Sequence, residues 1–483
     1  MKTKLKDSSL LETHAFMCGK WVACDKTFTV TNPANGQTVA EVADMSVADL
    51  NAAIDSAEKA QIAWRQTTAL HRADILMRWY GLLMENKEDL ACILTAEMGK
   101  PISEARGEVA YGAGFIRWFA EEARRTYGDV IPGHQVDKRI LVLKQPIGVV
   151  GSITPWNFPI AMIARKVAPA LAAGCTFVAR PAEQTPLSAL AMAVLAERAG
   201  IPESVFSVVT STDSQGFGFE LCTNPKIRKV TFTGSTEVGR ILMRQCSNDI
   251  KKISLELGGN APFIVFDDAD IDAAVQGVLI AKFRNSGQTC VCANRIYAQS
   301  GIHDEFVEKL ASAVSKLRLG NGMDEDVHIG PIIDRGGVKK VQEHLEDAVL
   351  KGAQIVSGGK CSDLGEQFFE PTVIANVNDT MRLMGEETFG PLAPIIRFET
   401  ETEVLEAANN TEFGLASYFY TKDVSRVFRF GEALEYGMVG VNTGLISTPE
   451  APFGGIKSSG LGREGSKYGM DDYLELKYMC LEV

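Results

Sequence analysis

Cysteine and histidine are sparse in this sequence, and neither follows a disulfide or metal-binding pattern. The 10 cysteines are scattered singly apart from Cys290 and Cys292, and the 6 histidines lie far from one another. Secreted disulfide proteins carry dense cysteine frameworks, and zinc sites use closely spaced ligands. We therefore expect reduced thiols and neither a structural nor a catalytic metal.

Positive charge is also in deficit, with 49 lysines and arginines against 61 aspartates and glutamates, which gives a net charge of -12. Proteins that bind a nucleic-acid backbone or an anionic membrane surface need the opposite balance. Residues 1–7 lack the apolar core and the cleavage site of a secretory signal. We expect a cytoplasmic protein that binds neither nucleic acid nor membrane.

One uncharged stretch, residues 146–164, could be mistaken for a membrane span. Pro146, Pro155 and Pro159 interrupt it, however, so it cannot form one continuous helix. The stretch instead predicts a buried strand that leads through a loop into a helix.

A Gly-x-Gly-x-x-Gly motif is absent, although the middle of the chain has the order of a nucleotide-binding sheet. With 483 residues, 46% of them hydrophobic, the chain is long enough for two or more domains. Apolar runs and helical patterns alternate at 147–153, 161–173, 176–180, 186–199, 205–209 and 229–232. This alternation predicts a parallel sheet covered by helices, with ligands at the carboxyl ends of its strands.

Residues 233–236 offer a different phosphate site. They read Thr233-Gly234-Ser235-Thr236 between an expected strand and an expected helix, where backbone N–H groups and hydroxyls are free to bind an anion. Ordinary helix capping explains the same residues, and on their own they favour the cap.

The segments that flank the sheet have other patterns. Short alternating runs around a turn predict a small hairpin unit over 16–42, and 47–125 are helical. Residues 127–142 are extended, as in an edge ribbon or an intersubunit arm, and the alternating tail at 473–478 is expected to pair with them.

Cys290 lies on a loop that could carry a nucleophile. An amphipathic pattern over 271–281 precedes this loop and follows Asp267 and Asp268, whose carboxylates suit a helix N-terminus. A loop between rigid elements directs the thiol, and Gly287 lets a substrate approach closely. Taken alone, a small buried cysteine is the simpler interpretation.

Glu256 ends an apolar strand pattern at 252–256 and is followed by Gly258 and Gly259. A carboxylate in such a strand is costly unless it faces a cleft or a charged partner. Two interpretations stay open: a functional carboxylate in a cleft, and a salt-bridged residue at a strand end.

Several motifs stand in order along the chain: Pro155-Trp156-Asn157-Phe158-Pro159, Phe232-Thr233-Gly234-Ser235, Leu255-Glu256-Leu257-Gly258-Gly259, Gly287-Gln288-Thr289-Cys290, Glu386-Glu387-Thr388-Phe389-Gly390-Pro391 and Pro452-Phe453-Gly454-Gly455. Together they resemble the NAD(P)-dependent aldehyde dehydrogenases, most closely the succinate-semialdehyde dehydrogenases, over residues 16–480. The resemblance implies an α/β fold with a Rossmann-type dinucleotide-binding domain (1–126 and 147–256), an α/β catalytic domain (257–460) and a small β oligomerisation arm (127–146 and 461–483).

The resemblance also implies catalytic roles: Cys290 is the nucleophile, Asn157 the oxyanion donor and Glu256 the general base. A thiolate that adds to an aldehyde creates an alkoxide, which the Asn157 amide and the Cys290 backbone N–H stabilise. Hydride then leaves for nicotinamide, and Glu256 activates the water that hydrolyses the thioester.

The implied coenzyme is NAD or NADP. The resemblance assigns its binding to Thr154, Pro155, Trp156, Gly234 and Ser235, with Glu387 and Phe389 at the nicotinamide ribose. Arg180 and Glu183 depart from the usual family pattern near the adenosine ribose. A carboxylate repels a 2′-phosphate, whereas a guanidinium attracts it. Between these opposed effects the sequence favours NAD slightly and predicts some use of both coenzymes.

For the substrate, the resemblance implies that Arg165, Arg284 and Ser447 bind the distal carboxylate of a semialdehyde, because a guanidinium matches a carboxylate bidentately. The alternatives are a helix-end cation at Arg284 and a solvated pair of Arg165 with Lys166. The expected reaction is oxidation of succinate semialdehyde to succinate, with glutarate semialdehyde or a broader range of aldehydes as alternative substrates.

Two expectations concern regulation and assembly. The resemblance implies that Cys292 forms a redox switch with Cys290, whereas the residues alone favour a small buried side chain. The ribbon at 127–142 and the C-terminal strand suggest a homo-oligomer, either a dimer or a tetramer. A cysteine hydrolase that uses Cys290 and Glu256 without a coenzyme is the alternative from another class of enzyme.

Overall fold

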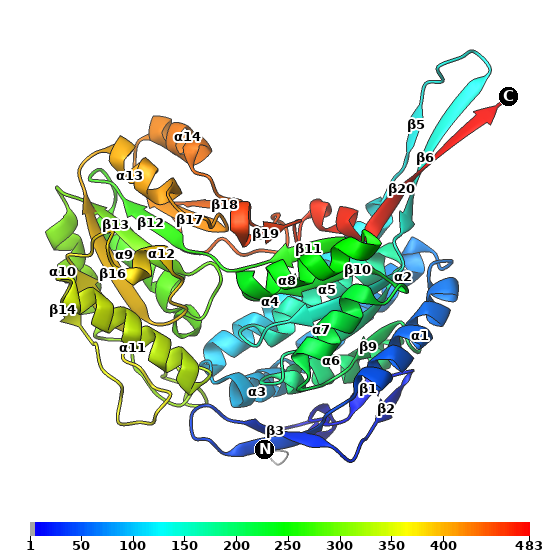
Figure 1. Cartoon of the computed structure of the whole chain (residues 1–483), viewed down its shortest axis with the longest axis horizontal. Helices are drawn as coiled ribbons and strands as arrows, with labels where there is room; N and C mark the ends of the chain where they lie inside the picture. The colour runs from blue at the N-terminus through cyan, green and yellow to red at the C-terminus, as the bar shows by residue number, and fades with distance from the viewer. Residues whose placement is uncertain (1–4) are drawn as a thin grey trace.

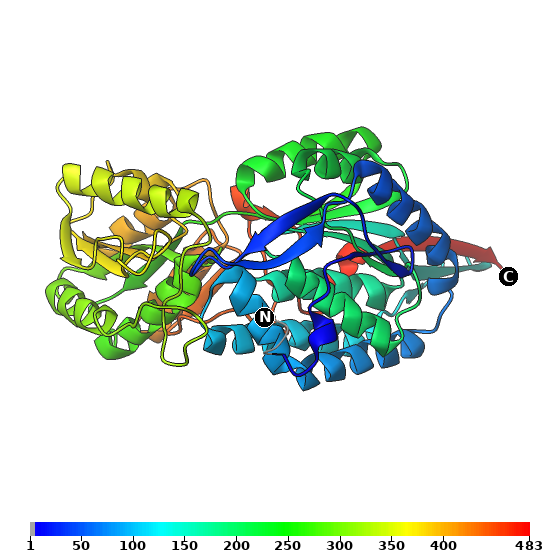
Figure 2. The same ribbon diagram turned by 90° about the horizontal axis from the view of Figure 1, so that it is seen from below.

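The computed structural model describes residues 5–483, which form two α/β lobes and a projecting β arm (Figure 1). An eight-stranded sheet forms the first lobe, a seven-stranded sheet the second and a three-stranded sheet the arm. A separate hairpin of β3 (Thr27–Thr31) and β4 (Thr38–Ala43) runs beneath the lobes (Figures 1 and 2). The predicted α/β fold is confirmed.

The first lobe contains the sheet expected from the middle of the chain, in the order β19-β11-β10-β7-β8-β9-β1-β2. Its strands are β1 (Ala15–Met17), β2 (Lys20–Val22), β7 (Val149–Thr154), β8 (Thr176–Pro181), β9 (Phe206–Val208), β10 (Ile227–Thr233), β11 (Lys252–Glu256) and β19 (Gly460–Leu461). The strands from β11 to β9 are parallel, and every residue of β7 and β8 is buried. Contrary to the single hairpin unit expected at the N-terminus, β1 and β2 form a second hairpin that extends this sheet.

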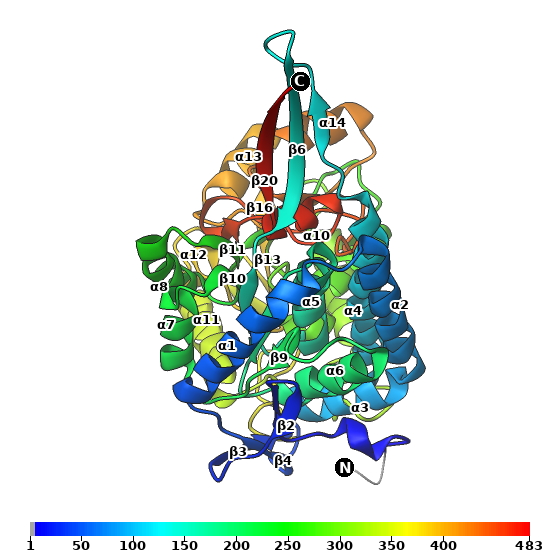
Figure 3. The ribbon, with the colours of Figure 1, turned by 90° about the vertical axis from the view of Figure 1, so that its right-hand side faces the viewer.

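Helices cover both faces of the first sheet (Figure 3). One face packs against α1 (Val47–Trp64), α7 (Ser214–Thr223) and α8 (Thr236–Cys246). The other packs against α5 (Pro159–Ala173) and α6 (Pro186–Ala199), behind which lie α2 (Ala69–Glu85), α3 (Lys87–Met98) and α4 (Ile102–Glu122). Of the helical region expected over 47–125, α1 therefore packs directly on the sheet, whereas α2, α3 and α4 form an outer layer behind α5 and α6.

Two of these helices are capped by carboxylates from elsewhere in the chain. Both α5 and α6 begin with proline, and neither has a side-chain cap of its own. Glu108 of α4 accepts from the amide of Ile160 at 3.0 Å, while Glu97 of α3 accepts from Leu187 at 2.7 Å and Ser188 at 2.8 Å. A buried helix N-terminus needs such acceptors because its first amides have no partner within the helix. The outer layer therefore orients the helices that line the sheet.

The second lobe repeats the parallel α/β plan in the order β14-β15-β16-β13-β12-β17-β18. Its strands are β12 (Ala261–Val265), β13 (Ala293–Gln299), β14 (Gln354–Ser357), β15 (Thr372–Ala375), β16 (Leu392–Phe398), β17 (Ala416–Tyr420) and β18 (Met438–Val441). Only β14 pairs antiparallel. The helices are α9 (Ile271–Val278), α10 (His303–Val314), α11 (Arg335–Leu350), α12 (Arg382–Gly385), α13 (Glu401–Asn409) and α14 (Val424–Ala433).

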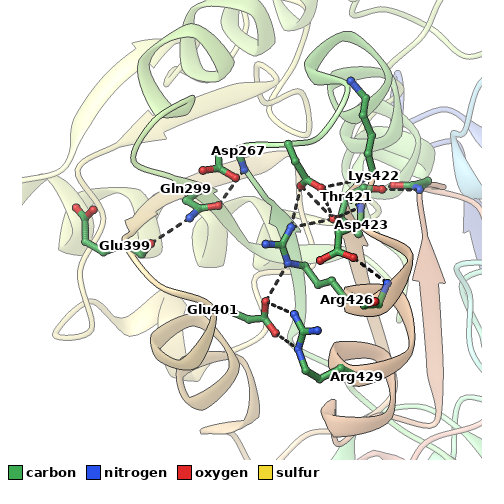
Figure 4. Close-up of polar contacts among 12 residues, drawn as sticks. Asp267, Gln299, Glu399, Glu401, Thr421, Lys422, Asp423, Arg426 and Arg429 are labelled. Atoms are coloured by element: carbon green, nitrogen blue, oxygen red, sulfur yellow. Dashed lines mark hydrogen bonds and ion pairs between the residues drawn. The ribbon is translucent and has the colours of Figure 1, made fainter.

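The prediction that Asp267 or Asp268 lies at the N-terminus of α9 was wrong. Asp270 caps the helix by accepting from the Ala273 amide at 3.0 Å. Asp268 instead accepts from the hydroxyl of Thr421 and pairs with Arg426 at 2.9 Å. That arginine also pairs with Glu401, which binds Arg429 as well (Figure 4). This network joins the ends of strands and helices on the outside of the second lobe.

The arm consists of β5 (Asp129–Ile131), β6 (Lys138–Pro146) and β20 (Leu474–Glu482). As predicted, the terminal strand pairs with the ribbon: β20 runs antiparallel to β6 from Leu474 opposite Pro146 to Glu482 opposite Lys138. The arm projects beyond the first lobe, and its tip has no neighbouring element (Figures 1 and 3).

The uncharged stretch at 146–164 forms β7, a loop and the start of α5, as its prolines predicted. Within residues 5–483, no helix has both the length and the apolar character that crossing a membrane requires.

The external cap of α6 yields a stability prediction. Replacing Glu97 with alanine removes both acceptors from the amides of Leu187 and Ser188, and a buried donor without a partner costs about 1–3 kcal/mol. The free energy of unfolding in urea should fall by at least that amount. Replacing the exposed Glu346 of α11 with alanine is the matched control and should change it by no more than about 0.5 kcal/mol. Equal losses in the two variants would contradict the capping role.

Candidate active site

The site lies between the two lobes, at the carboxyl ends of β7, β10 and β11. A cavity of about 360 Å³ is lined from the first lobe by Trp156, Ser235 and Glu256, and from the second by Cys290 and Phe389. Parallel sheets place their ligand sites at this end because loops and helix N-termini converge there.

The chain reaches Cys290 through an irregular segment after α9. The helix expected to continue to 281 ends at Val278, and a π-helical turn at Leu279–Phe283 follows. Asn285, Ser286 and Gly287 then adopt left-handed backbone conformations, with φ of 52°, 57° and 76°. Such a run is costly for residues other than glycine, so the surrounding contacts must stabilise it.

Gly287 serves packing rather than access, contrary to the expectation. A Cβ at this position would lie 2.2 Å from the carbonyl oxygen of Gly390, which belongs to the Glu386–Pro391 motif. The loop that carries Cys290 is therefore pressed against a second loop, and only glycine permits that contact.

Asn157 and Cys290 meet across the boundary between the lobes. Asn157 Nδ2 donates to the carbonyl oxygen of Gln288 at 3.0 Å, which leaves its second N–H free to donate. Cys290 is half-buried, and burial raises the pKa of its thiol to about 11 despite the opposing effect of Arg165. The protein therefore holds this cysteine as a thiol near neutral pH.

Glu256 ends β11 inside the same cavity. Its carboxyl group is buried, and neither oxygen has a hydrogen-bond partner. Burial and the nearby Glu464 raise its pKa well above the ordinary value. Because Glu256 makes no ion pair within residues 5–483, the salt-bridge interpretation is wrong, and the carboxyl group faces the cavity instead. A carboxyl group with a raised pKa can exchange protons near neutral pH.

The residues expected to bind the substrate line a second, smaller cavity on the other side of Cys290. Its volume is about 20 Å³, and its lining includes Tyr111, Phe158, Arg165, Arg284, Ser447 and Phe453. The structure thus brings Arg165, Arg284 and Ser447 together beside the thiol. Cys290 stands between this cavity and the larger one.

The two arginines differ in how their charge is balanced. Arg165 and Lys166 are both buried and both pair with Glu464, so the solvated pair considered from the sequence is wrong. Arg284 lies 5.4 Å from the centre of the Phe158 ring, and no carboxylate within residues 5–483 forms an ion pair with it. Arg284 therefore keeps its charge available for an anion.

The sequence analysis missed Glu464. It is the only acidic residue in the glycine-rich stretch 452–465, and that isolation was the available signal. Its buried carboxylate outweighs the burial of Arg165 and raises the pKa of that guanidinium.

Several residues expected to hold a dinucleotide line the larger cavity. The rings of Trp156 and Phe389 meet edge to face with centroids 5.6 Å apart. Glu387 accepts from the Gly259 amide at 3.1 Å, and burial raises its pKa to about 7. Ser235 both lines the cavity and caps α8 by accepting from the Val238 amide, so the cap and the anion site considered from the sequence coincide. Pro155 and Gly234 lie beside them.

Three other expected coenzyme residues lie outside that cavity, at the ends of neighbouring strands. Thr154 ends β7 opposite Pro181 of β8. Arg180 donates to Glu183 at 2.7 Å and to the carbonyl of Ser211 at 3.1 Å, so its charge is already paired.

Cys292 is buried, with its Sγ 3.4 Å from Nζ of Lys282, and that lysine also donates to Asn294 at 3.2 Å. All 10 cysteines are free thiols, as expected.

A thiol between two cavities, with an amide donor and an unpaired carboxyl group beside it, is the arrangement of a cysteine-dependent oxidoreductase built on a dinucleotide-binding sheet. The chain belongs to the aldehyde dehydrogenase family, which matches residues 21–479. It is 61% identical to a glutarate-semialdehyde dehydrogenase of Pseudomonas aeruginosa over 480 residues, 99% of each chain. It is 60% identical to an NADP+ succinate-semialdehyde dehydrogenase of Escherichia coli, again over 99% of each chain.

The fold agrees with this membership. A crystal structure of an Escherichia coli NADP-dependent enzyme superposes with a TM-score of 0.98 at 60% identity, covering 99% of this chain and 100% of that one.

The raised pKa of Cys290 predicts how its reactivity changes with pH. The thiolate is the form that reacts with iodoacetamide. Alkylation of Cys290 in the coenzyme-free protein should therefore rise about tenfold per pH unit from pH 7 to 10, since a pKa near 11 lies above that range. Free cysteine, with a pKa of about 8.5, should level off near pH 9 in the same buffers. Mass spectrometry of the Cys290 peptide measures the rate, and a plateau below pH 9 would contradict the prediction.

Proposed function

We propose that the protein oxidises succinate semialdehyde to succinate with NAD(P)+ and water. The observation that carries this proposal is the small cavity behind Cys290, which is lined by an arginine without an ion-pair partner. An aldehyde carbon at the thiol and a carboxylate at that arginine define the two ends of a semialdehyde.

In the proposed reaction, each side chain around the thiol has a separate role. The Cys290 thiol gives its proton to solvent water as its sulfur adds to the aldehyde carbon, and the free N–H of Asn157 together with the Cys290 backbone amide stabilises the resulting alkoxide. The bound coenzyme supplies a hydride acceptor. Glu256 takes the proton of the water that attacks the thioester, and Cys290 departs as the leaving group with release of the acid.

The larger cavity fits the nicotinamide half of a dinucleotide. The N-terminus of α8 at Ser235 offers backbone N–H groups to phosphate, and Glu387 offers carboxylate oxygens to ribose hydroxyls. Trp156 and Phe389 supply aromatic walls.

For the choice of coenzyme, we propose that the protein uses both NAD and NADP. The slight preference for NAD expected from the sequence has no support in the relatives, since the Escherichia coli relative is named for NADP+. The ion pair between Arg180 and Glu183 gives a physical reason. A carboxylate paired with a guanidinium repels a 2′-phosphate less than a free one does.

The relatives at 60% and 61% identity are named for succinate and glutarate semialdehyde, so identity does not separate the two substrates. The arginine-lined cavity behind Cys290 supports an aldehyde with a distal carboxylate and is compatible with either chain length. Glutarate semialdehyde, one carbon longer, is the alternative substrate. A hydrolase without a coenzyme is disfavoured by the family and by the second, larger cavity on the coenzyme side of Cys290.

For assembly, we propose a homo-oligomer in which the arm contacts another copy of the chain. Val130, Leu476 and Tyr478 are exposed on the arm, which leaves apolar surface on paired strands. From the division of the chain among three sheets, we propose a dinucleotide-binding domain of 1–126 and 147–256, a catalytic domain of 257–460 and an arm of 127–146 and 461–483. Within that last range, Leu461 pairs with β11 of the first sheet, and the arm strand itself begins at Leu474.

The role of Glu256 predicts a burst. Glu256→Gln removes the base for hydrolysis but leaves thiol addition and hydride transfer in place. Mixing this variant with succinate semialdehyde and coenzyme should release about one equivalent of reduced coenzyme per site and then stall, as measured by stopped-flow absorbance at 340 nm. A variant without a burst would show that Glu256 acts earlier, on the thiol.

The unpaired charge of Arg284 predicts a change of specificity. Arg284→Ala removes a charge-assisted hydrogen bond worth about 1.5–3 kcal/mol, so kcat/KM for succinate semialdehyde should fall about 10–150-fold relative to butanal. Butanal has no distal carboxylate, and its kcat/KM should stay nearly unchanged.

A control variant and a comparison of coenzymes accompany this test. Arg429→Ala removes a guanidinium that pairs with Glu401 outside the site and should leave the ratio of the two substrates unchanged. Measuring kcat/KM of each variant with NAD and again with NADP checks, in the same series, the separate proposal that the protein uses both coenzymes. Parallel losses for both aldehydes in Arg284→Ala would assign Arg284 to its helix end and the protein to a broader aldehyde range.

A further inference from the structure

Below the site, helix α4 and the residue just before it carry charges that the reaction does not use. Glu104 and Glu108 lie four residues apart, on the same face of α4. Lys100 precedes the helix, and the side chains of Lys100 and Glu108 are 0% and 1% exposed. Charges this deeply buried are costly unless each has a partner, so their contacts indicate what they do.

Lys100 holds the backbone of the oxyanion donor. Its Nζ donates to Glu108 at 2.5 Å and to the backbone carbonyl of Asn157 at 2.7 Å, and lies 3.8 Å from the centre of the Phe158 ring. The same carbonyl accepts from Nδ2 of Asn285 at 3.0 Å. Two donors, one of them charged, therefore fix the peptide group from which the Asn157 side chain extends.

The two carboxylates connect this peptide to the rest of the site. Glu108 binds Lys100 with one oxygen and the Ile160 amide, at the start of α5, with the other. Glu104 accepts from the backbone amide of Asn285 at 2.8 Å, at the first left-handed residue of the loop that carries Cys290. The amide donor and the nucleophile loop are thereby attached to one helix face.

We propose that Lys100, Glu108 and Glu104 are positioning residues for the oxyanion site. They touch no reacting atom and act through Asn157 and the Cys290 loop. Hydrogen-bond donors stabilise a developing oxyanion only where they are preorganised, and a displacement of about 1 Å can cost about 100-fold in rate. The proposal rests on the proposed function only in assigning oxyanion chemistry to Cys290.

The alternative is a buried ion pair that only stabilises the fold. Two reactions at the same thiol separate these possibilities, and neither needs coenzyme or a semialdehyde. Acylation by p-nitrophenyl acetate forms an S–C bond, passes through an oxyanion and expels p-nitrophenolate, while the thiol proton goes to a base. Alkylation by iodoacetamide displaces iodide at an sp³ carbon and forms no oxyanion.

The experiment compares both rates at Cys290 in the full-length protein. Lys100→Met should lower the acylation rate about 100-fold, the cost expected for a displaced donor, and change the alkylation rate less than about threefold. Glu108→Gln keeps the size of the side chain and an oxygen for the Ile160 amide but loses the charge opposite Lys100. It should lower acylation selectively by about 10-fold. This second variant decides the question if Lys100→Met does not fold.

A matched control is available in Lys229, which is also fully buried and hydrogen-bonds Ser254 of the first sheet. Lys229→Met should lower thermal stability but leave the ratio of acylation to alkylation unchanged. The double variant Lys100→Met, Asn157→Ala should be acylated no more slowly than Asn157→Ala alone. If Lys100 acts through Asn157, the losses of acylation rate from the two substitutions do not add.

Three outcomes would overturn the proposal: additive losses in the double variant, an equal fall of both reactions in Lys100→Met, or the same fall of the ratio in Lys229→Met. If succinate semialdehyde is not oxidised but the acylation ratio responds as stated, the proposed substrate fails and the positioning role stands.

Discussion

The hydrogen bond from Asn157 Nδ2 to the carbonyl of Gln288 is the constraint on which the site depends. It crosses the boundary between two lobes that have separate sheets and cores. The donor follows the end of β7, and the acceptor lies two residues before Cys290. Any relative shift of the lobes would separate the amide from the thiol, so the surrounding structure has to oppose that shift.

Close packing and hydrogen bonds beside the Asn157–Gln288 bond oppose a relative shift of the two lobes. Gly287 and Gly390 approach so closely that no side chain fits between them. Nδ2 of Asn285 donates to the carbonyls of both Asn157 and Gln288, and its backbone amide donates to Glu104, so three hydrogen bonds hold this residue in its left-handed conformation. Backbone strain at a loop is tolerated where the neighbouring structure over-determines it.

Burial also sets the electrostatics of the site. Burial raises the pKa of both Cys290 and Glu256, and the nearby Glu464 adds to the effect on Glu256. Glu464 compensates the buried cations Arg165 and Lys166, whereas Arg284 has no such carboxylate within residues 5–483. A low dielectric strengthens the interactions of any charge that develops during a reaction, and within residues 5–483 Arg284 brings a positive charge to the small cavity without a carboxylate to balance it.

The sequence by itself determined the local elements and predicted which groups react. Periodicity and prolines placed β7, α5, β8 and α6 nearly at their observed bounds, because local backbone preferences and burial act over a few residues. The alternating tail even indicated its partner strand. The motifs singled out Cys290, Glu256 and Asn157, since their chemistry is a property of the side chains.

Only the tertiary structure decided how those groups are paired and which charges are free. Asp268 was expected to cap a helix and instead binds Arg426. Arg165 lines the small cavity beside Cys290, as expected, but its pairing with the buried Glu464 was not foreseen. Lys100 contacts Asn157 across 57 positions of the chain, and Lys166 contacts Glu464 across 298. Charge pairing and desolvation depend on distances of a few ångströms between segments far apart in the chain, and no local pattern encodes those distances.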